Sequence, residues 1–139
     1  ASFHPGGSIG KKLMRVDELM HRGDAIPRVL ESTPMPDVIY EMSRKSLGMT
    51  VVTDGQGVLC GIVSDGDLRR LLQKSGDPLR LSAGQAMTRN PKTVAPDALA
   101  ASALSQMEAM RITSLVVVDS GRKVVGVIHL HDLWRTELI

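Results

Sequence analysis

Gly61, Ser64 and Asp67 are spaced three residues apart, where a stretch that predicts a strand meets one that predicts a helix. The Ser64 hydroxyl and the free N–H groups of a helix start can face a phosphate, and the Asp67 carboxylate can accept from both hydroxyls of a ribose. A Ser followed three residues later by an acidic residue is also spaced like a near capping box. The spacing therefore supports two interpretations: a site for a phosphorylated ribose, and a plain helix start.

A second window, Gly126, His129 and Asp132, has the same spacing with His in place of Ser. An imidazole at residue 129 suits an anionic ligand and would make binding depend on pH. His129 and His131 would point the same way on a strand, as ligands of a metal do. No further His or Cys in this copy completes a ligand set, so we expect solvated histidines at the junction and no metal.

These two windows belong to an internal repeat. Residues 50–54 align with residues 115–119 at an offset of 65, and at the same offset Gly61 falls on Gly126 and Asp67 on Asp132. Upstream, residues 18–20 align with residues 85–87 at an offset of 67, which is two residues longer. The chain therefore contains two copies of a unit of about 60 residues.

Each copy predicts the same elements in the order β-α-β-β-α. Short strands are expected near residues 26–30 and 92–95, and turns at residues 54–57 and 119–122. Apolar residues spaced by three or four predict a helix in each copy, beginning near residues 36–37 and 96–97, where Pro precedes Asp. A closing helix is expected from about Asp65 and from about Leu130. The apolar positions of the two long helices are Met35, Ile39 and Met42, and Ala100, Leu104 and Met107.

Uninterrupted Val, Leu and Ile runs predict strands that are covered on both faces. A sheet of three strands with two helices cannot cover itself, so the two copies are expected to pack sheet against sheet as one pseudo-twofold α/β body. Residues 75–78, with sequence Ser-Gly-Asp-Pro, predict the linker between them.

Composition excludes several classes of function. The 139 residues carry 17 basic and 15 acidic side chains mixed along the chain, and aromatic residues are only 2%, so neither a basic stripe nor stacking platforms for nucleic acid are present. Apolar runs fall short of the roughly 20 residues of a membrane span. With a single cysteine, Cys60, and no signal segment, we expect a cytoplasmic protein.

The repeat resembles the CBS motif, and the two copies resemble a CBS domain pair over roughly residues 16–138. The resemblance implies domains at residues 14–76 and 77–139, and a regulatory nucleotide bound in clefts between the repeats. It favours the ligand interpretation of Ser64 and Asp67 and extends it to Asp132, while His129 departs from the pattern. The remaining contact residues that it implies are Met49, Thr50, Thr88, Lys92, Thr93, Val94, Thr113, Ser114, Leu115 and His131. For Met49, Val94 and Leu115, each taken singly, a core role is the favoured interpretation.

Residues 1–13 lie outside the repeat. From His4 onward they resemble the junction between the sugar isomerase domain and the CBS pair of D-arabinose 5-phosphate isomerases, which interconvert ribulose 5-phosphate and arabinose 5-phosphate on the way to Kdo and lipopolysaccharide. This resemblance makes His4 a candidate catalytic residue of the parent enzyme, in a proton transfer through an enediol. The 139 residues alone are not expected to be an enzyme.

Three hypotheses remain open. In the first, the pair senses the pathway's product, CMP-Kdo or CMP, with AMP and ATP ranked behind. In the second it is a structural module that joins copies of the parent into a homo-oligomer through Met-rich helical faces. In the third it is an adenylate sensor attached to another enzyme or a transporter.

Overall fold

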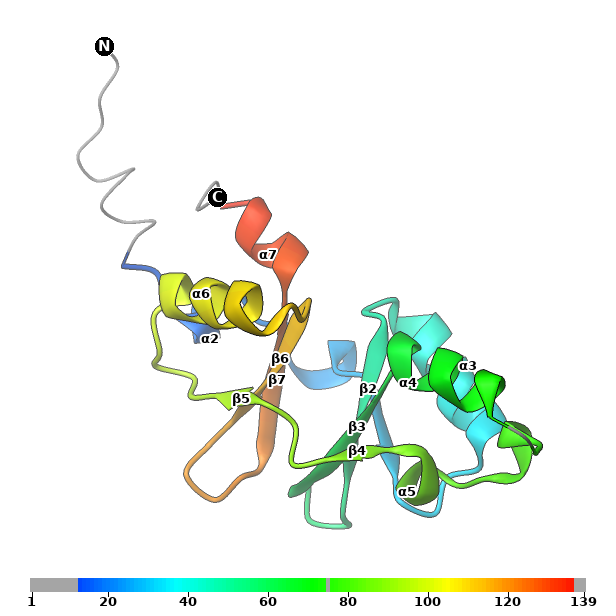
Figure 1. The fold of residues 1–139 in the computed structure, drawn as a ribbon. Helices are drawn as coiled ribbons and strands as arrows, with labels where there is room; N and C mark the ends of the chain where they lie inside the picture. Colours follow the sequence, from blue (N-terminus) through cyan, green and yellow to red (C-terminus); the bar gives the residue numbers. More distant parts are fainter. Residues whose placement is uncertain (1–12, 75, 137–139) are drawn as a thin grey trace.

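The computed structural model describes residues 13–74 and 76–136, which form two sheets (Figure 1). The first has the order β1 (Arg28–Leu30), β2 (Met49–Thr53), β3 (Leu59–Ser64) and β4 (Thr88–Arg89). The second has the order β5 (Thr93–Val94), β6 (Ser114–Val118) and β7 (Val124–His129). In each sheet the first pair of strands is parallel and the next antiparallel. The predicted β-α-β-β-α order is confirmed in both copies.

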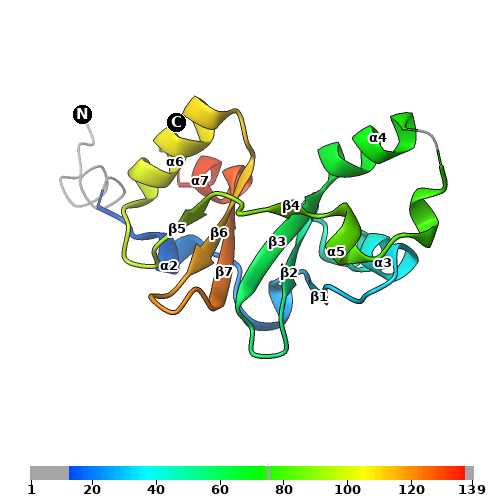
Figure 2. The same ribbon diagram turned by 60° about the horizontal axis from the view of Figure 1, so that its bottom comes forward.

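The helices lie on the outer faces of the two sheets. Helices α3 (Met35–Lys45) and α4 (Asp65–Gln73) cover the first sheet, and α6 (Ala100–Met110) and α7 (Leu130–Trp134) cover the second (Figures 1 and 2). Shorter elements precede each unit: α2 (Val16–Leu19) with the 3-10 turn η1 (Gly23–Ala25), and the 3-10 turn η2 (Pro78–Arg80) with α5 (Ala83–Ala86). The two sheets therefore form the inner layers of the molecule.

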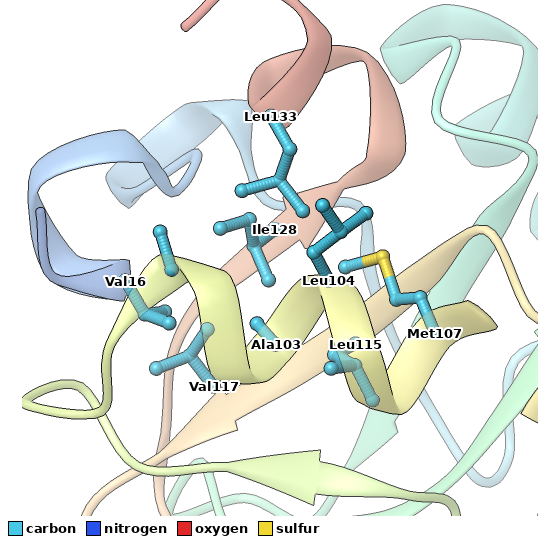
Figure 3. Packing of buried hydrophobic residues seen from close by; sticks show 9 residues of the cluster. Val16, Ala103, Leu104, Met107, Leu115, Val117, Ile128 and Leu133 are labelled. Atoms are coloured by element: carbon cyan, nitrogen blue, oxygen red, sulfur yellow. The ribbon is translucent and has the colours of Figure 1, made fainter. Parts of the chain in front are cut away.

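Three apolar clusters explain why the strands have two buried faces. One cluster lies between the sheets and joins Val51 and Leu59 of the first to Val116 and Val127 of the second. The other two lie under the helices of each unit; Figure 3 shows the one beneath α6 and α7, with Leu104 and Met107 among its members. The predicted packing of sheet against sheet is confirmed. It follows from strands such as β2, all five residues of which are buried.

The segment that leads into each repeat packs on the other repeat. Val16 of α2 belongs to the cluster under α6, and α5 contacts β1 and β3. Strand β4 pairs with β3, and His21 forms the corresponding bridge to Val127 of β7. Each copy thus completes the other.

Gly61 and Gly126 are the residues that allow these crossings. A Cβ on Gly61 would lie 2.6 Å from the Thr88 carbonyl oxygen, and one on Gly126 would lie 2.9 Å from that of His21. These separations are shorter than side chains tolerate, so the first residue of each Gly-x-x-x-x-x-Asp window is required by the neighbouring chain rather than by a ligand.

Two details differ from the helix expectations. Helix α6 begins at Ala100, not at residues 96–97, because those residues form a turn in which the carbonyl oxygens of Pro96 and Ala98 accept from the N–H groups of Asp17 and Val16, at 2.9 and 2.8 Å. In α3 the buried stripe is Met35, Val38 and Met42, with Ile39 only half-buried.

Candidate ligand clefts

A cleft of about 660 Å³ opens where the two repeats meet. One wall is the start of α4, with Ser64 and Gly66, and the opposite wall is the loop after α6, with Thr113. β4 and the chain that joins it to β5 also line the cleft, with Thr88 and Lys92. We call it cleft 1. Elements of both repeats are needed to build it.

Asp67 supports this cleft from behind Ser64. Its Oδ2 accepts from the Ser64 N–H and hydroxyl at 2.9 and 3.0 Å, and its Oδ1 accepts from Thr88 Oγ1 at 2.9 Å and from Arg70 at 2.5 Å. The Asp67 N–H donates in turn to Ser64 Oγ, at 3.2 Å. The side chain is 7% exposed. A capping box is therefore formed, and a ribose would have to exchange with one of these donors to reach the carboxylate.

The electrostatics of Asp67 follow from these bonds. Burial alone would raise the pKa of the carboxyl, but hydrogen bonds from the Ser64 backbone, Thr88 and Arg70 outweigh that effect and lower it. Asp67 is accordingly ionised at neutral pH and fixes the position of the Thr88 and Arg70 side chains beside the cleft.

A smaller cleft of about 360 Å³ lies at the corresponding place in the other repeat. His21, His129, His131 and Arg135 line it, together with residues 46–48. We call it cleft 2. Asp132 is 3% exposed and accepts from the His129 N–H at 2.8 Å and from Arg135 at 2.7 Å, and its Oδ1 lies 3.0 Å from His21 Nε2. His21 and Arg135 thus take the places that Thr88 and Arg70 have around Asp67.

His129 replaces the capping hydroxyl of Ser64. Its Nδ1 accepts from the His131 N–H at 3.1 Å, so in this arrangement Nδ1 carries no proton. Burial, and then the charge of His131, lower the pKa of His129, against the opposing effect of Asp132. The imidazole is therefore neutral at pH 7 and presents a hydrogen-bond donor rather than a positive charge.

Among the residues that the structure describes, no group of three or more His, Cys, Asp or Glu side chains is arranged to hold a metal ion. His129 and His131 instead lie ring to ring, with centroids 4.6 Å apart.

The structure brings many of the predicted contact residues together. Met49, Ser64, Thr88, Lys92, Thr113, Ser114 and His129 line cleft 1, and His129, His131 and Asp132 line cleft 2. Thr50, Thr93, Val94 and Leu115 line neither cleft. Thr50 is buried with its hydroxyl donated to the Val51 carbonyl oxygen, Val94 packs against the cluster under α6, and Leu115 belongs to that cluster. His4 lies outside the described residues.

Other lining residues carried too weak a signal in the sequence. Arg111 follows α6, Asp65 begins α4, and His21 precedes η1. The repeat itself points to two of the missed residues. Arg135 lies 65 residues after Arg70, and His21 aligns with Thr88 at the upstream offset of 67. Applying the offset to every residue near Asp67 would have found both.

This fold of two interlocked β-α-β-β-α units with a cleft at each junction is that of a CBS domain pair. The CBS domain family matches residues 16–74 and 83–133, so the chain belongs to that family. Within it, the chain is similar to the arabinose 5-phosphate isomerases KdsD of Pseudomonas aeruginosa, with 47% identity over 136 residues, and of Escherichia coli K12, with 43% over 140 residues. These matches cover 97% and 100% of this chain but only 42% of each relative.

Solved structures share the fold. A CBS domain protein of Pyrobaculum aerophilum, PAE2072, complexed with AMP, has 25% identity and a TM-score of 0.76, covering 86% of this chain and 89% of that one. CBSX2 in complex with AMP has 24% identity and a TM-score of 0.76, covering 89% and 96%. Within residues 13–74 and 76–136 of the present chain, no helix is long and apolar enough to cross a bilayer.

Proposed function

We propose that this chain is the regulatory CBS part of an arabinose 5-phosphate isomerase and binds a nucleotide in cleft 1. The observation that carries the proposal is the cleft itself: about 660 Å³ of space between the repeats, with the hydroxyls of Ser64 and Thr88 held at its edge by Asp67. A volume of that size suits a ligand of nucleotide dimensions. The AMP complex of a relative with the same fold supports the choice of ligand class.

The role in the parent enzyme is inferred from the KdsD relatives, of which this chain spans 42%. In this proposal residues 1–13 form the junction with a sugar isomerase domain, residues 14–76 and 77–139 are the two CBS repeats, and His4 acts in isomerisation. A product of the pathway is the natural regulator, so CMP-Kdo or CMP is our first candidate and AMP or ATP the second.

Calorimetric titration of the chain with CMP-Kdo, CMP, AMP, ATP and S-adenosylmethionine tests the proposal. We expect binding that Asp67→Asn weakens by about tenfold or more, because a charge-assisted hydrogen bond contributes about 1.5–3 kcal/mol. Asp132→Asn, which alters cleft 2, should leave nucleotide binding in cleft 1 unchanged. Asp119→Asn, which alters the turn between β6 and β7 away from both clefts, is the matched control. Heat-silent titrations with every compound at millimolar concentration would overturn the proposal.

A structural role in assembly is a second candidate. The Met-rich faces expected to support it are largely absent: of the methionines on α3 and α6, Met35, Met42 and Met107 are buried in the chain's own core, and Met110 is 41% exposed. Other large apolar side chains on the outer helices are exposed instead, including Leu72 at 72% and Tyr40 at 66%. A dimer that persists at nanomolar concentration in sedimentation, and that Leu72→Asp dissociates, would support assembly; a monomer at micromolar concentration would exclude it.

A further inference from the structure

The charges around cleft 1 are unbalanced. Arg69, Arg70, Lys92 and Arg111 line it, and Asp65 is the one carboxylate in its lining. Arg70 is paired with Asp67, whereas Arg69, Lys92 and Arg111 form no ion pair within the described part of the chain. Three cations with no ion-pair partner among residues 13–74 and 76–136 therefore line one cleft, although like charges repel when brought together.

Cleft 2 lacks this excess. Its one arginine, Arg135, is paired with Asp132 at 2.7 Å, and its histidines include the neutral His129. The loop that faces it begins with Ser46, which is the counterpart of Arg111 in the other repeat. The two clefts are therefore related by the repeat but differ in charge.

Arg111 also adopts a backbone conformation that is unfavourable for a residue with a Cβ. It has φ 56° at the end of α6, the left-handed region in which helices usually end on Gly or Asn. Its counterpart Ser46 has φ 59° and the same role at the end of α3. A residue with a Cβ at such a position lowers the stability of the chain relative to Gly.

The cations come from both repeats. Arg69 lies on α4 of the first, and Lys92 and Arg111 flank β5 and α6 of the second. From the charge and from the contribution of both repeats to its walls, we propose that cleft 1 is the single anion site of this chain. It holds the phosphate or diphosphate of a nucleotide between Arg69 of one repeat and Lys92 and Arg111 of the other.

This inference rests on the proposed function and deepens it, because it states where the charged end of the nucleotide lies and that cleft 2 does not hold it. Arg111 and Lys92 are then residues that determine specificity. A bound anion would also link the two repeats across the cleft, since each repeat supplies part of its coordination.

The test compares charged and uncharged ligands. The chain is titrated with CDP and ADP, with cytidine and adenosine, and with inorganic pyrophosphate. We expect one nucleotide per chain. Arg111→Gly, Arg111→Ser and Lys92→Gln should each weaken diphosphate binding by about tenfold, as expected for loss of a charged contact, and leave nucleoside binding unchanged.

Arg122→Gly is the matched control. Arg122 also has a left-handed backbone, φ 62°, but it lies in the turn between β6 and β7, outside both clefts, where the first repeat has Gly57. Arg111→Gly and Arg122→Gly should both raise the Tm of the unliganded chain, by roughly 2 °C or more, because both relieve the same backbone cost. Only Arg111→Gly should weaken diphosphate binding.

The outcomes separate this inference from the proposed function. Diphosphates that bind the Arg111 and Lys92 variants as tightly as the unaltered chain, or that bind two per chain, would overturn the inference and leave nucleotide binding intact. If no nucleotide or nucleoside binds, the proposed function fails. Pyrophosphate binding that depends on Arg111 would then still support the anion site. If pyrophosphate does not bind either, the anion site is overturned too.

Discussion

At the scale of single residues, Asp67 illustrates how one carboxylate can serve a helix and a ligand cleft together. Its two oxygens accept from Ser64, Thr88 and Arg70, which belong to two different repeats. Asp132 does the same with His129, His21 and Arg135. The acidic residue of each window therefore joins a helix start to the chain that crosses from the other repeat.

Replacing Asp67 with Asn should lower the free energy of unfolding at pH 7 by about 1–3 kcal/mol, because several donors lose a charged acceptor. The pKa of Asp67 is lowered in the folded state, so its contribution is present above the ordinary pKa of about 4 and disappears as pH falls through the folded value. Urea unfolding at pH 7 and at pH 3 checks this: the difference between the chain and the variant should shrink at pH 3. Asp97→Asn, at an exposed residue, should change the free energy of unfolding at neither pH. If Asp67→Asn lowered the free energy of unfolding equally at pH 7 and pH 3, that result would contradict the assignment.

His129 should make stability fall on mild acidification. Its folded pKa is lowered, so below about pH 6.5 the unfolded chain takes up a proton at this residue more readily than the folded chain, and stability declines as pH falls. The groups that act on it are His131, Asp132 and His21. His129→Ser, which restores the residue of the first repeat, should flatten the dependence of Tm on pH between 7.5 and 5.5. An unchanged slope in the variant would place the dependence on other groups.

At the scale of elements, the leading segments are the parts that interlock the repeats. Strand β4 lies against Gly61 of β3, and the bridge at His21 lies against Gly126 of β7. The same junctions position Thr88 and His21 beside the motif carboxylates. Close approach of backbone to backbone at these two glycines therefore sets the geometry of both clefts.

Gly61→Ala should destabilise the chain by about 1–3 kcal/mol, the usual range for forcing an extra carbon into a packed site. The added Cβ would lie 2.6 Å from the Thr88 carbonyl oxygen and 2.7 Å from Met87 Sδ. Gly55→Ala is the control, since nothing lies within 4 Å of a Cβ there. Thermal unfolding of both variants decides the point; equal Tm values for Gly61→Ala and the unaltered chain would show that β4 can move away without cost.

At the scale of the whole molecule, the pseudo-twofold relation reaches the hairpin tips. The Leu59 N–H donates to the Arg122 carbonyl oxygen and the Val124 N–H to that of Gly57, both at 3.0 Å. Together with the crossing segments and the cluster between the sheets, these bonds make the two repeats one folding unit.

Fragments covering residues 1–75 and 76–139 should each fail to fold alone, because each lacks the segment that covers its own helices and strands: Val16 and α2 for the second repeat, and Ala83, Met87 and β4 for the first. Mixing them at equal concentration should restore the structure. Circular dichroism and sedimentation of the fragments, separate and mixed, check this. Cooperative unfolding of either fragment by itself would show that a repeat is an independent domain.

The sequence by itself determined the repeat, the order of the elements and the burial of the strands on both faces. These features depend on an exact offset, on turn residues and on local periodicity. It also located Ser64, Asp67 and Asp132, since their spacing along one chain is the spacing of a helix start. Only the tertiary structure decided that each leading segment crosses to the other repeat, that Thr50 and Leu115 are buried outside both clefts, and that Arg111 lines cleft 1. Those facts depend on contacts between segments far apart in sequence. Close packing of whole faces determines these contacts, and it produces no periodic pattern in the sequence of either segment.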